Sequence, residues 1–264
     1  MAKDEGTGFE THMGGAVADW EGRVALLIEK SAASHIAPLL QGPARGPCWL
    51  PRRTYAAVIS QFFHGEVAAA RLCRRIGEEI DDPLASRFLM LQAAEEDRHA
   101  ALYAEYLQRL GGTAPVEPAF AECFESCLDA RMPAATILAA MTVLLEGASL
   151  KLHGTIRACF DCPLLARVIA AIDLDESRHV AFGRIYLLQQ VPLLPLEARI
   201  AGLRWLEALW ERSIVGRVSS RMGPRQVPAA LSLSSRDGQC WGCVACCHAL
   251  QGGHGSAARS WLSS

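Results

Sequence analysis

The chain has 264 residues, of which 51% are apolar and 20% charged, and its formal net charge is −2. A chain of this length can bury one large hydrophobic core or two small ones. The near-neutral charge gives no electrostatic reason to expect nucleic acid or an anionic membrane surface as a partner.

The N-terminal segment 1–15 is polar and contains glycine, and it lacks a basic region followed by an apolar one, so no signal peptide is expected. The longest apolar runs, such as 137–145, are too short to span a bilayer. We therefore expect a soluble cytoplasmic protein with no membrane partner. A first helix is expected over 17–38, and prolines and glycines predict a loop over 41–51.

Four long segments with helical periodicity follow this loop. They cover 52–80, 83–110, 133–160 and 163–191. No window in the chain alternates apolar and polar residues in the way typical of a strand. The short connections make the first and second segments antiparallel neighbours, and likewise the third and fourth, while the longer link over 112–132 suits a crossover. The sequence predicts an all-α protein organised around an up-down four-helix bundle.

A fifth helix is expected over 195–222, packed outside the bundle. The composition then shifts abruptly to Gly, Ser, Pro and Cys, so we divide the chain into a helical domain over 1–222, with its bundle core over 52–191, and an irregular tail over 223–264. The Cys240–His248 cluster in this tail has ligand types found in zinc and iron–sulfur sites, but a disordered Cys-rich tail or an altered reading frame would also explain it.

One short pattern occurs twice in the predicted bundle, as Glu96-Asp-Arg-His99 and Glu176-Ser-Arg-His179. Positions i and i+3 share a helix face, so each copy points a carboxylate and an imidazole in the same direction. The offset in numbering between the two copies, 176 − 96, is 80, and both copies have Arg before the histidine.

A lone glutamate precedes each copy at the same interval, Glu66 before Glu96 and Glu146 before Glu176, so these two glutamates are related by the same 80-residue offset. Each lies in an apolar stretch, where an ionised carboxylate is costly unless it is paired. Taken alone, either glutamate would more simply face solvent or pair with an arginine. The repeated spacing instead favours a shared site.

Two bound metal ions would resolve this electrostatic problem, because four carboxylates carry −4 and two divalent ions carry +4. A glutamate from each of two helices and a Glu-x-x-His from each of two others is the ligand set of di-iron and di-manganese helical bundles. Carboxylate and imidazole ligands suit iron, with manganese an alternative at one or both positions. The predicted ligands are Glu66, Glu96, His99, Glu146, Glu176 and His179.

Further candidates surround this ligand set. Glu95 and Asp175 precede the motif glutamates, and we expect each to accept the free N–H of a ligand histidine, across to the opposite helix, with Arg98 and Arg178 balancing their charge; a solvated charged face is the alternative.

Tyr103 and Thr142 are candidate catalytic residues. Tyr103 lies one turn beyond His99 and would act as a redox-active tyrosine. Thr142 lies one turn before Glu146 and would assist oxygen activation, as could Ser149 nearby. The simpler alternatives are that Tyr103 lines the core and that the hydroxyls bond their own helix backbone. His64 and His153 have no partner at the 80-residue offset, so we do not expect either to be a ligand.

With these residues in place, the segment 52–191 resembles the ferritin-like superfamily of di-iron carboxylate proteins. The stretch 175–183, Asp-Glu-Ser-Arg-His-Val-Ala-Phe-Gly, is more similar to the oxygen-activating, ribonucleotide-reductase-like branch than to the storage ferritins. The resemblance implies an up-down bundle, the six ligands named above, and a hydrogen bond from an acid placed like Asp175 to a ligand histidine.

The function expected from the site and the resemblance is that of a di-iron oxidoreductase, an oxygenase or oxidase that uses dioxygen as co-substrate to oxidise a small organic molecule. Such an enzyme needs an electron-donor protein or another reductant, and a homodimer is compatible with the sequence. Two alternatives remain: a radical-generating subunit of the ribonucleotide-reductase type, with Tyr103 as the radical site, and a non-enzymatic iron-storage or iron-binding protein. The sequence leaves open the choice between hydroxylation, N-oxygenation, desaturation and aldehyde cleavage.

Overall fold

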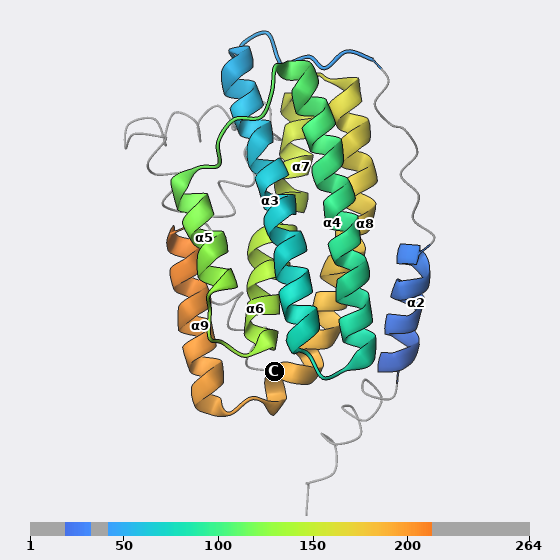
Figure 1. Ribbon diagram of the computed structural model, residues 1–264, viewed down its shortest axis with the longest axis vertical. Helices are drawn as coiled ribbons and strands as arrows, with labels where there is room; N and C mark the ends of the chain where they lie inside the picture. The colour runs from blue at the N-terminus through green and yellow to red at the C-terminus, as the bar shows by residue number, and fades with distance from the viewer. Residues whose placement is uncertain (1–18, 33–41, 213–264) are drawn as a thin grey trace, which may run out of the picture.

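The computed structural model describes residues 19–32 and 42–212, and these residues contain helices and no strand (Figure 1). The all-α class is therefore confirmed for the part of the chain that the structure describes. The predicted tail over 223–264 and its Cys240–His248 cluster lie outside these residues. The elements are α2 (Trp20–Ala32), α3 (Arg52–Glu79), α4 (Pro83–Leu110), α5 (Pro118–Leu128), α6 (Ala134–Ala140), η1 (Met141–Glu146), α7 (Gly147–Cys159), α8 (Pro163–Gln190), η2 (Val191–Leu193) and α9 (Leu196–Trp210).

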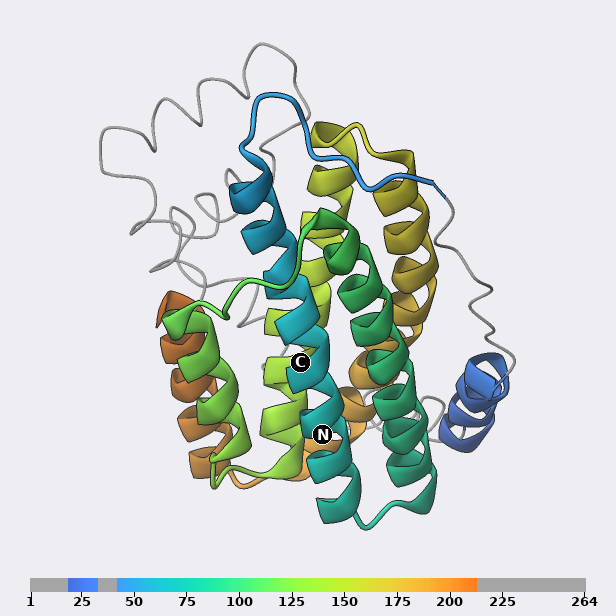
Figure 2. The ribbon, with the colours of Figure 1, turned by 45° about the horizontal axis from the view of Figure 1, so that its top comes forward.

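Four long helical segments lie side by side: α3, α4, α8 and the continuous run α6–η1–α7 (Figures 1 and 2). Helices α3, α4 and α8 have 28 residues each, which corresponds to roughly 42 Å at 1.5 Å per residue. α3 packs along α4, α8 packs against α4 and α7, and α3 contacts α6 and η1. Each long segment begins and ends within a residue of its predicted bounds.

Local chemistry explains where these helices begin and end. The side chain of Asp82 caps α4 by accepting hydrogen bonds from the backbone N–H groups of Leu84 at 2.8 Å and Ala85 at 3.0 Å. Pro83 follows it in the first turn, where the missing N–H costs nothing. At the other end Gly111 adopts a left-handed φ of 103°, which a residue with a side chain rarely does, and its N–H bonds the carbonyl of Gln108 at 3.1 Å. These signals fix the length of α4 and so the position of its motif.

The sequence analysis expected the third long segment to be a uniform α-helix, but it is not. Over Met141–Glu146 it widens into the π-helical segment η1, and the N–H of Gly147 bonds the carbonyl of Thr142, five residues back. A π-helical turn inside an α-helix re-aims the side chains that follow it, and such turns are frequent at functional sites. The widened turn ends at Glu146, one of the predicted ligands.

Three further helices pack outside the four long segments. α5, which the sequence analysis did not predict, lies within the link over 112–132 beside α3, and Arg75 donates a hydrogen bond of 2.8 Å to the carbonyl of Cys127 near its end. α2 packs against α4 and α8 on the opposite side, where Trp20 donates to Asp82 at 3.2 Å (Figure 2). α9 packs against α6. The outer helices thus pack along the sides of the long segments.

The third long segment also bears on the prediction that no part of the chain could span a membrane. Ala134–Cys159 is long and apolar enough to do so by length and composition, although no single apolar run in it is. An 18-residue window of it is 53% buried inside the protein, and the core helix of a soluble protein passes the same test. The segment is weak support for a membrane span, and the cytoplasmic location stays a prediction.

Candidate metal centre

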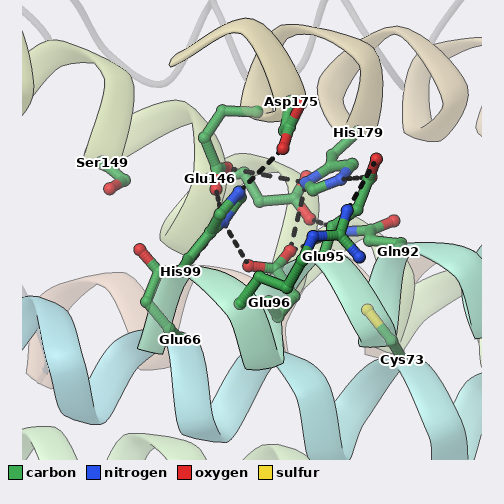
Figure 3. Close-up of polar contacts among 12 residues, drawn as sticks. Glu66, Cys73, Gln92, Glu95, Glu96, His99, Glu146, Ser149, Asp175 and His179 are labelled. Atoms are coloured by element: carbon green, nitrogen blue, oxygen red, sulfur yellow. Dashed lines mark hydrogen bonds and ion pairs between the residues drawn. The ribbon is translucent and has the colours of Figure 1, made fainter. Parts of the chain in front are cut away.

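The structure brings the six predicted ligands together at mid-height of the long helices (Figure 3). One comes from α3, one from the end of η1, and two each from α4 and α8. All six side chains are buried, the most exposed at 6%. They are Glu66, Glu96, His99, Glu146, Glu176 and His179. The described residues therefore contain a buried acidic and histidine cluster that could hold metal.

The cluster consists of two groups whose ligand atoms lie within 4.8 Å of one another, and Glu96 belongs to both. In the first group, Nδ1 of His99 lies 3.4 Å from Glu96, 3.5 Å from Glu176 and 3.6 Å from Glu66. In the second, Nδ1 of His179 lies 3.1 Å from the other oxygen of Glu96. Glu96 therefore links the two groups through its two carboxylate oxygens.

Several of these ligand atoms have no hydrogen-bond partner among the described residues, although they are fully buried. They are Nδ1 of His99, Nδ1 of His179, Oε2 of Glu96 and Oε2 of Glu146. A buried polar atom without a partner costs about 1–3 kcal/mol, and native proteins contain few of them. Four such atoms, all of types that bind metal ions, fit a site that could hold metal.

Each ligand histidine is held by an acid from the opposite helix. Nε2 of His99 on α4 donates to Asp175 on α8 at 3.0 Å, and Nε2 of His179 on α8 donates to Glu95 on α4 at 2.7 Å. This reciprocal pairing directs Nδ1 of both rings toward the cluster. The expected contacts across the helices are therefore present, while the contribution of the two acids to metal binding stays a prediction.

Arg178 balances both of these acids, whereas Arg98 contributes less. The guanidinium of Arg178 donates to Glu95 at 2.9 Å and also to Asp175. Arg98 is 3.6 Å from Glu95, and its side chain is 40% exposed. An exposed ion pair of that kind contributes little, so the charge compensation rests mainly on Arg178.

The cluster shifts the pKa values of its own members in the metal-free protein. Burial raises the pKa of Glu66 and that of Glu146 well above the usual value, and neighbouring carboxylates add to this rise. Burial alone would lower the pKa of His99, but Asp175 and the facing carboxylates raise it well above its usual value. The metal-free cluster therefore holds protons where cations would sit, and metal binding must release them.

Gln92 belongs to the site but was not predicted. It lies one turn before Glu96 on α4, and its amide donates to Glu96 at 3.3 Å and also to Glu146. The amide thus links a carboxylate of α4 to the one that ends η1 (Figure 3). Its helical spacing from Glu96 was the available signal. It was missed because the equivalent position in the second repeat is Ile172.

Thr142 and Tyr103 are both buried near the cluster. The hydroxyl of Thr142 has no hydrogen-bond partner among the described residues, so the expected alternative of a bond to its own helix backbone is not seen. Tyr103 is fully buried, packs in the core and bonds His153 at 2.8 Å. Of the histidines we did not expect to be ligands, His64 bonds the carbonyl of Ala114 at 2.9 Å.

Replacing Asp175 with alanine should weaken metal binding about 10- to 100-fold, because His99 then loses the acceptor that orients it. Anaerobic titration with ferrous or manganous ions measures the change. Asp97→Ala is the matched control: Asp97 lies in the same motif but faces outward, where it pairs with Arg74 and its side chain is 56% exposed. Equal affinities for Asp175→Ala and the wild-type protein would contradict a role for Asp175 in metal binding.

Comparison of the chain with models of known protein families, with curated proteins and with solved structures found no match. The fold and the site together define an all-helical protein with a buried carboxylate and histidine cluster that could bind metal. Any narrower assignment rests on the chemistry of this cluster.

Proposed function

We propose that the protein is a ferritin-like di-iron carboxylate oxidoreductase that uses dioxygen to oxidise a small organic substrate. The four long helices would form the four-helix bundle of that superfamily, with α5 and α9 added outside it. Iron is the metal we favour, with manganese as the alternative at one or both positions. The activity would also need an electron-donor protein or another reductant, and the expected location is the cytoplasm.

One observation carries this proposal: two imidazoles and four carboxylates are buried together, with ligand atoms of both histidines left without a partner. A structural zinc site would more often contain cysteine and would close its coordination shell. Here two imidazoles and four carboxylates would serve two ions, which leaves positions for dioxygen. A pair of iron or manganese ions bound there would supply the electrons that reduce dioxygen.

The residues of the chain have separable tasks in this proposal. Asp175 and Glu95 fix the ring orientation of the two histidines, and Arg178 balances the charge of both acids. Burial would raise the pKa of Asp175, but the hydrogen bond from His99 and the Arg178 guanidinium lower it to about 2. Gln92 holds Glu146 beside Glu96.

Thr142 would supply a hydroxyl to the oxygen chemistry. Its Oγ1 is buried and makes no hydrogen bond within the described residues, so it is free to donate a proton beside Glu146. A hydroxyl already bonded to its helix backbone could not do so without breaking that bond.

A radical-generating subunit is the second candidate function. Tyr103 favours it, because this tyrosine is fully buried one turn beyond His99, and the negative charges of Glu66 and Glu176 act on its hydroxyl. In that function the tyrosine itself would be the product of the oxygen reaction, and a separate catalytic protein would be the partner. No observation in the structure favours iron storage over these two.

Anaerobic loading with ferrous iron tests the proposal. We expect about two iron ions per chain, with affinity that falls as the pH is lowered because protons compete for the same ligand atoms. Admission of dioxygen should then consume dioxygen in proportion to the iron bound and change the absorption of the protein. Manganese loaded in parallel distinguishes the two metals.

Binding of one ion or none per chain would remove the di-iron assignment. Binding of two ions without dioxygen consumption would leave a metal-binding protein and remove the oxidoreductase. Electron paramagnetic resonance after oxygen addition separates the two candidates, since a stable tyrosyl radical would favour the radical-generating subunit over the oxygenase.

A further inference from the structure

A chain of hydrogen bonds leads from beside the metal cluster to the protein surface. The hydroxyl of Tyr103 lies 2.8 Å from Nε2 of His153, whose Nδ1 lies 2.7 Å from Asp173. The other oxygen of Asp173 pairs with Arg157 at 2.9 Å. The four groups come from α4, α7 and α8, so this Tyr–His–Asp–Arg chain is built by tertiary packing and not by one helix.

The partners of His153 determine which of its nitrogens carries the proton. Nδ1 faces the carboxylate of Asp173, which can only accept when ionised, so Nδ1 bears the hydrogen. Nε2 then has a free lone pair and accepts the phenolic O–H of Tyr103. Ser149 is a weaker neighbour of the same nitrogen at 3.3 Å. Nε2 of His153 can therefore accept the phenolic proton of Tyr103.

The two ends of the chain differ in exposure. Tyr103 and His153 are fully buried, and Phe62 covers both rings at centroid distances of 5.8 Å and 5.0 Å. Asp173 has a side chain that is 16% exposed, and that of Arg157 is 40% exposed. The inner end of the chain is therefore buried, and its outer end is partly exposed to solvent.

Burial raises the pKa of Tyr103 well above its usual value, and the negative charges of Glu66, Glu176 and Asp173 raise it further. A phenol in this position does not give up its proton by simple ionisation. Loss of an electron changes this, because an oxidised phenol is a strong acid. Proton and electron must therefore leave Tyr103 together, and the proton needs an acceptor at hydrogen-bond distance.

We propose that His153 is the proton acceptor that makes Tyr103 a one-electron donor beside the metal cluster, with Asp173 stabilising the charged imidazole. The phenolic O–H bond breaks and the proton forms a new N–H bond at Nε2 of His153. An oxidised metal ion held by the cluster would accept the one electron. Tyr103 is left as a neutral radical. Later reduction by one electron returns the proton to the phenol. This role deepens the second candidate function, that of a radical-generating subunit, and rests on it.

Asp173 gives the step its charge balance, and Arg157 holds the Asp173 carboxylate in place. Protonated His153 faces the carboxylate of Asp173, and before the step the nearby guanidinium of Arg157 offsets the charge of that carboxylate. The positive charge therefore forms next to a fixed negative one, in a low-dielectric setting where such a pairing matters most. Asp173 is thus a positioning residue for His153 and does not contact Tyr103 in this scheme.

The protein contains a matched control. Tyr55 and Tyr106 are also fully buried, and their hydroxyls bond each other at 2.7 Å, with Cys162 3.3 Å from Tyr106. Within the described part of the chain, no histidine is hydrogen-bonded to this tyrosine pair. If burial and hydrogen bonding alone stabilised a tyrosyl radical, the Tyr55 and Tyr106 pair would do so as well as Tyr103.

The test uses the full-length protein without metal. Ultraviolet photolysis of a frozen solution removes electrons from tyrosines, and high-field electron paramagnetic resonance detects the radicals formed. Subtracting the spectrum of Tyr103→Phe from that of the wild-type protein isolates the Tyr103 radical, and Tyr106→Phe gives the control difference. We expect a Tyr103 radical whose g-values show a hydrogen bond from a protonated imidazole.

His153→Phe and His153→Gln should each shorten the lifetime of this radical on warming by at least tenfold, and Asp173→Asn should shorten it less. Circular dichroism shows whether each variant folds. If His153→Phe does not fold, the radical lifetime in His153→Gln tests the proposal. Equal lifetimes in the wild-type protein and in a folded His153 variant would overturn the proposal, as would a Tyr103 radical no longer-lived than the control. Because no metal is present, a failure of metal loading leaves this result intact and removes the proposed function alone.

Discussion

Replacing Glu146 with glutamine should make the metal-free protein more stable and at the same time remove most of its stabilisation by metal. Burial raises the pKa of Glu146 well above its usual value of 4.5, and the charges of Glu176 and Glu96 add to the rise, although His179 opposes it. Glutamine keeps the shape of the side chain without its charge, and its carbonyl can still accept from Gln92. We expect the metal-free variant to gain about 1–2 kcal/mol in the free energy of unfolding at neutral pH.

The pH dependence should follow from the same shift. A carboxyl group whose pKa is raised in the folded state binds a proton more tightly there than in the unfolded chain. Stability of the metal-free wild-type protein should therefore decrease as the pH rises above about 4.5 toward the raised pKa of the folded state. Glu66 and the two ligand histidines act in the same direction, because their pKa values are raised as well. The Glu146→Gln curve should be flatter.

With metal bound, we expect the wild-type protein to be more stable than Glu146→Gln, the reverse of the order without metal. At a metal concentration one hundred times the dissociation constant, the wild-type protein gains about 2.7 kcal/mol. Loss of a ligand carboxylate should weaken binding by about a hundredfold or more, and at the same concentration the variant would then gain about 0.4 kcal/mol or less. Urea unfolding with and without ferrous or manganous ions measures all four values.

Glu105→Gln is the matched control, because Glu105 lies on the exposed side of α4 with a side chain that is 58% exposed. This substitution should change neither the free energy of unfolding without metal nor the stabilisation by metal by more than a few tenths of a kcal/mol. A Glu146→Gln protein that is less stable without metal, or that keeps its metal response, would show that Glu146 is not a ligand held under electrostatic strain.

The long helices and the residues of the buried cluster could be predicted because their signals are redundant along the chain. A proline at the start of α4 and one at the start of α8, a glycine pair after α4, and helical periodicity all mark the same boundaries. The 80-residue offset then relates two glutamate and histidine motifs that a single occurrence would not distinguish from chance. The buried cluster in the structure contains the six residues that this offset selected.

The polar groups that the sequence analysis missed lie where the two repeats differ. The same offset relates Gln92 to Ile172 and His153 to Cys73, so neither group has a chemically similar counterpart. Thr142, which was predicted from its position near Glu146, is related to Phe62. The π-helical segment likewise occurs in only one of the two repeats. No residue type predicts it, because a local change of helix pitch depends on how η1 packs against α8. A repeat therefore predicts the symmetric ligands and misses the groups that would make the two halves of the site chemically distinct.

The packing of η1 against α8 leads to the second large effect, a loss of stability on replacing Gly183 with alanine. A methyl group at Gly183 would lie 2.7 Å from Cγ2 and 2.9 Å from Cβ of Thr142, distances that real Cβ atoms essentially never show. Because Thr142 is β-branched and buried, it cannot turn away freely. We expect a loss of about 1–3 kcal/mol in the free energy of unfolding.

The same clash should weaken metal binding, because it forces apart two elements that each carry ligands. Gly183 lies one turn after His179 on α8, and Thr142 lies one turn before Glu146 on η1. Pushing η1 away from α8 would separate those two ligands. Removing the obstructing side chain tests this cause directly: in Thr142→Ala with Gly183→Ala, the coupling between the two changes should restore about 1–2 kcal/mol.

Gly154→Ala is the control for the intrinsic effect of the substitution. Gly154 lies in α7 with no heavy atom within 4 Å of the position that an added methyl group would occupy, so alanine there should stabilise the protein by about 0.5–1 kcal/mol through helix propensity alone. If Gly183→Ala were instead as stable as the wild-type protein, or if Thr142→Ala failed to relieve it, the close approach of η1 to α8 would be wrong. The placement of Glu146 beside His179 would then lose its structural basis, because that approach is what brings the π-helical turn against α8.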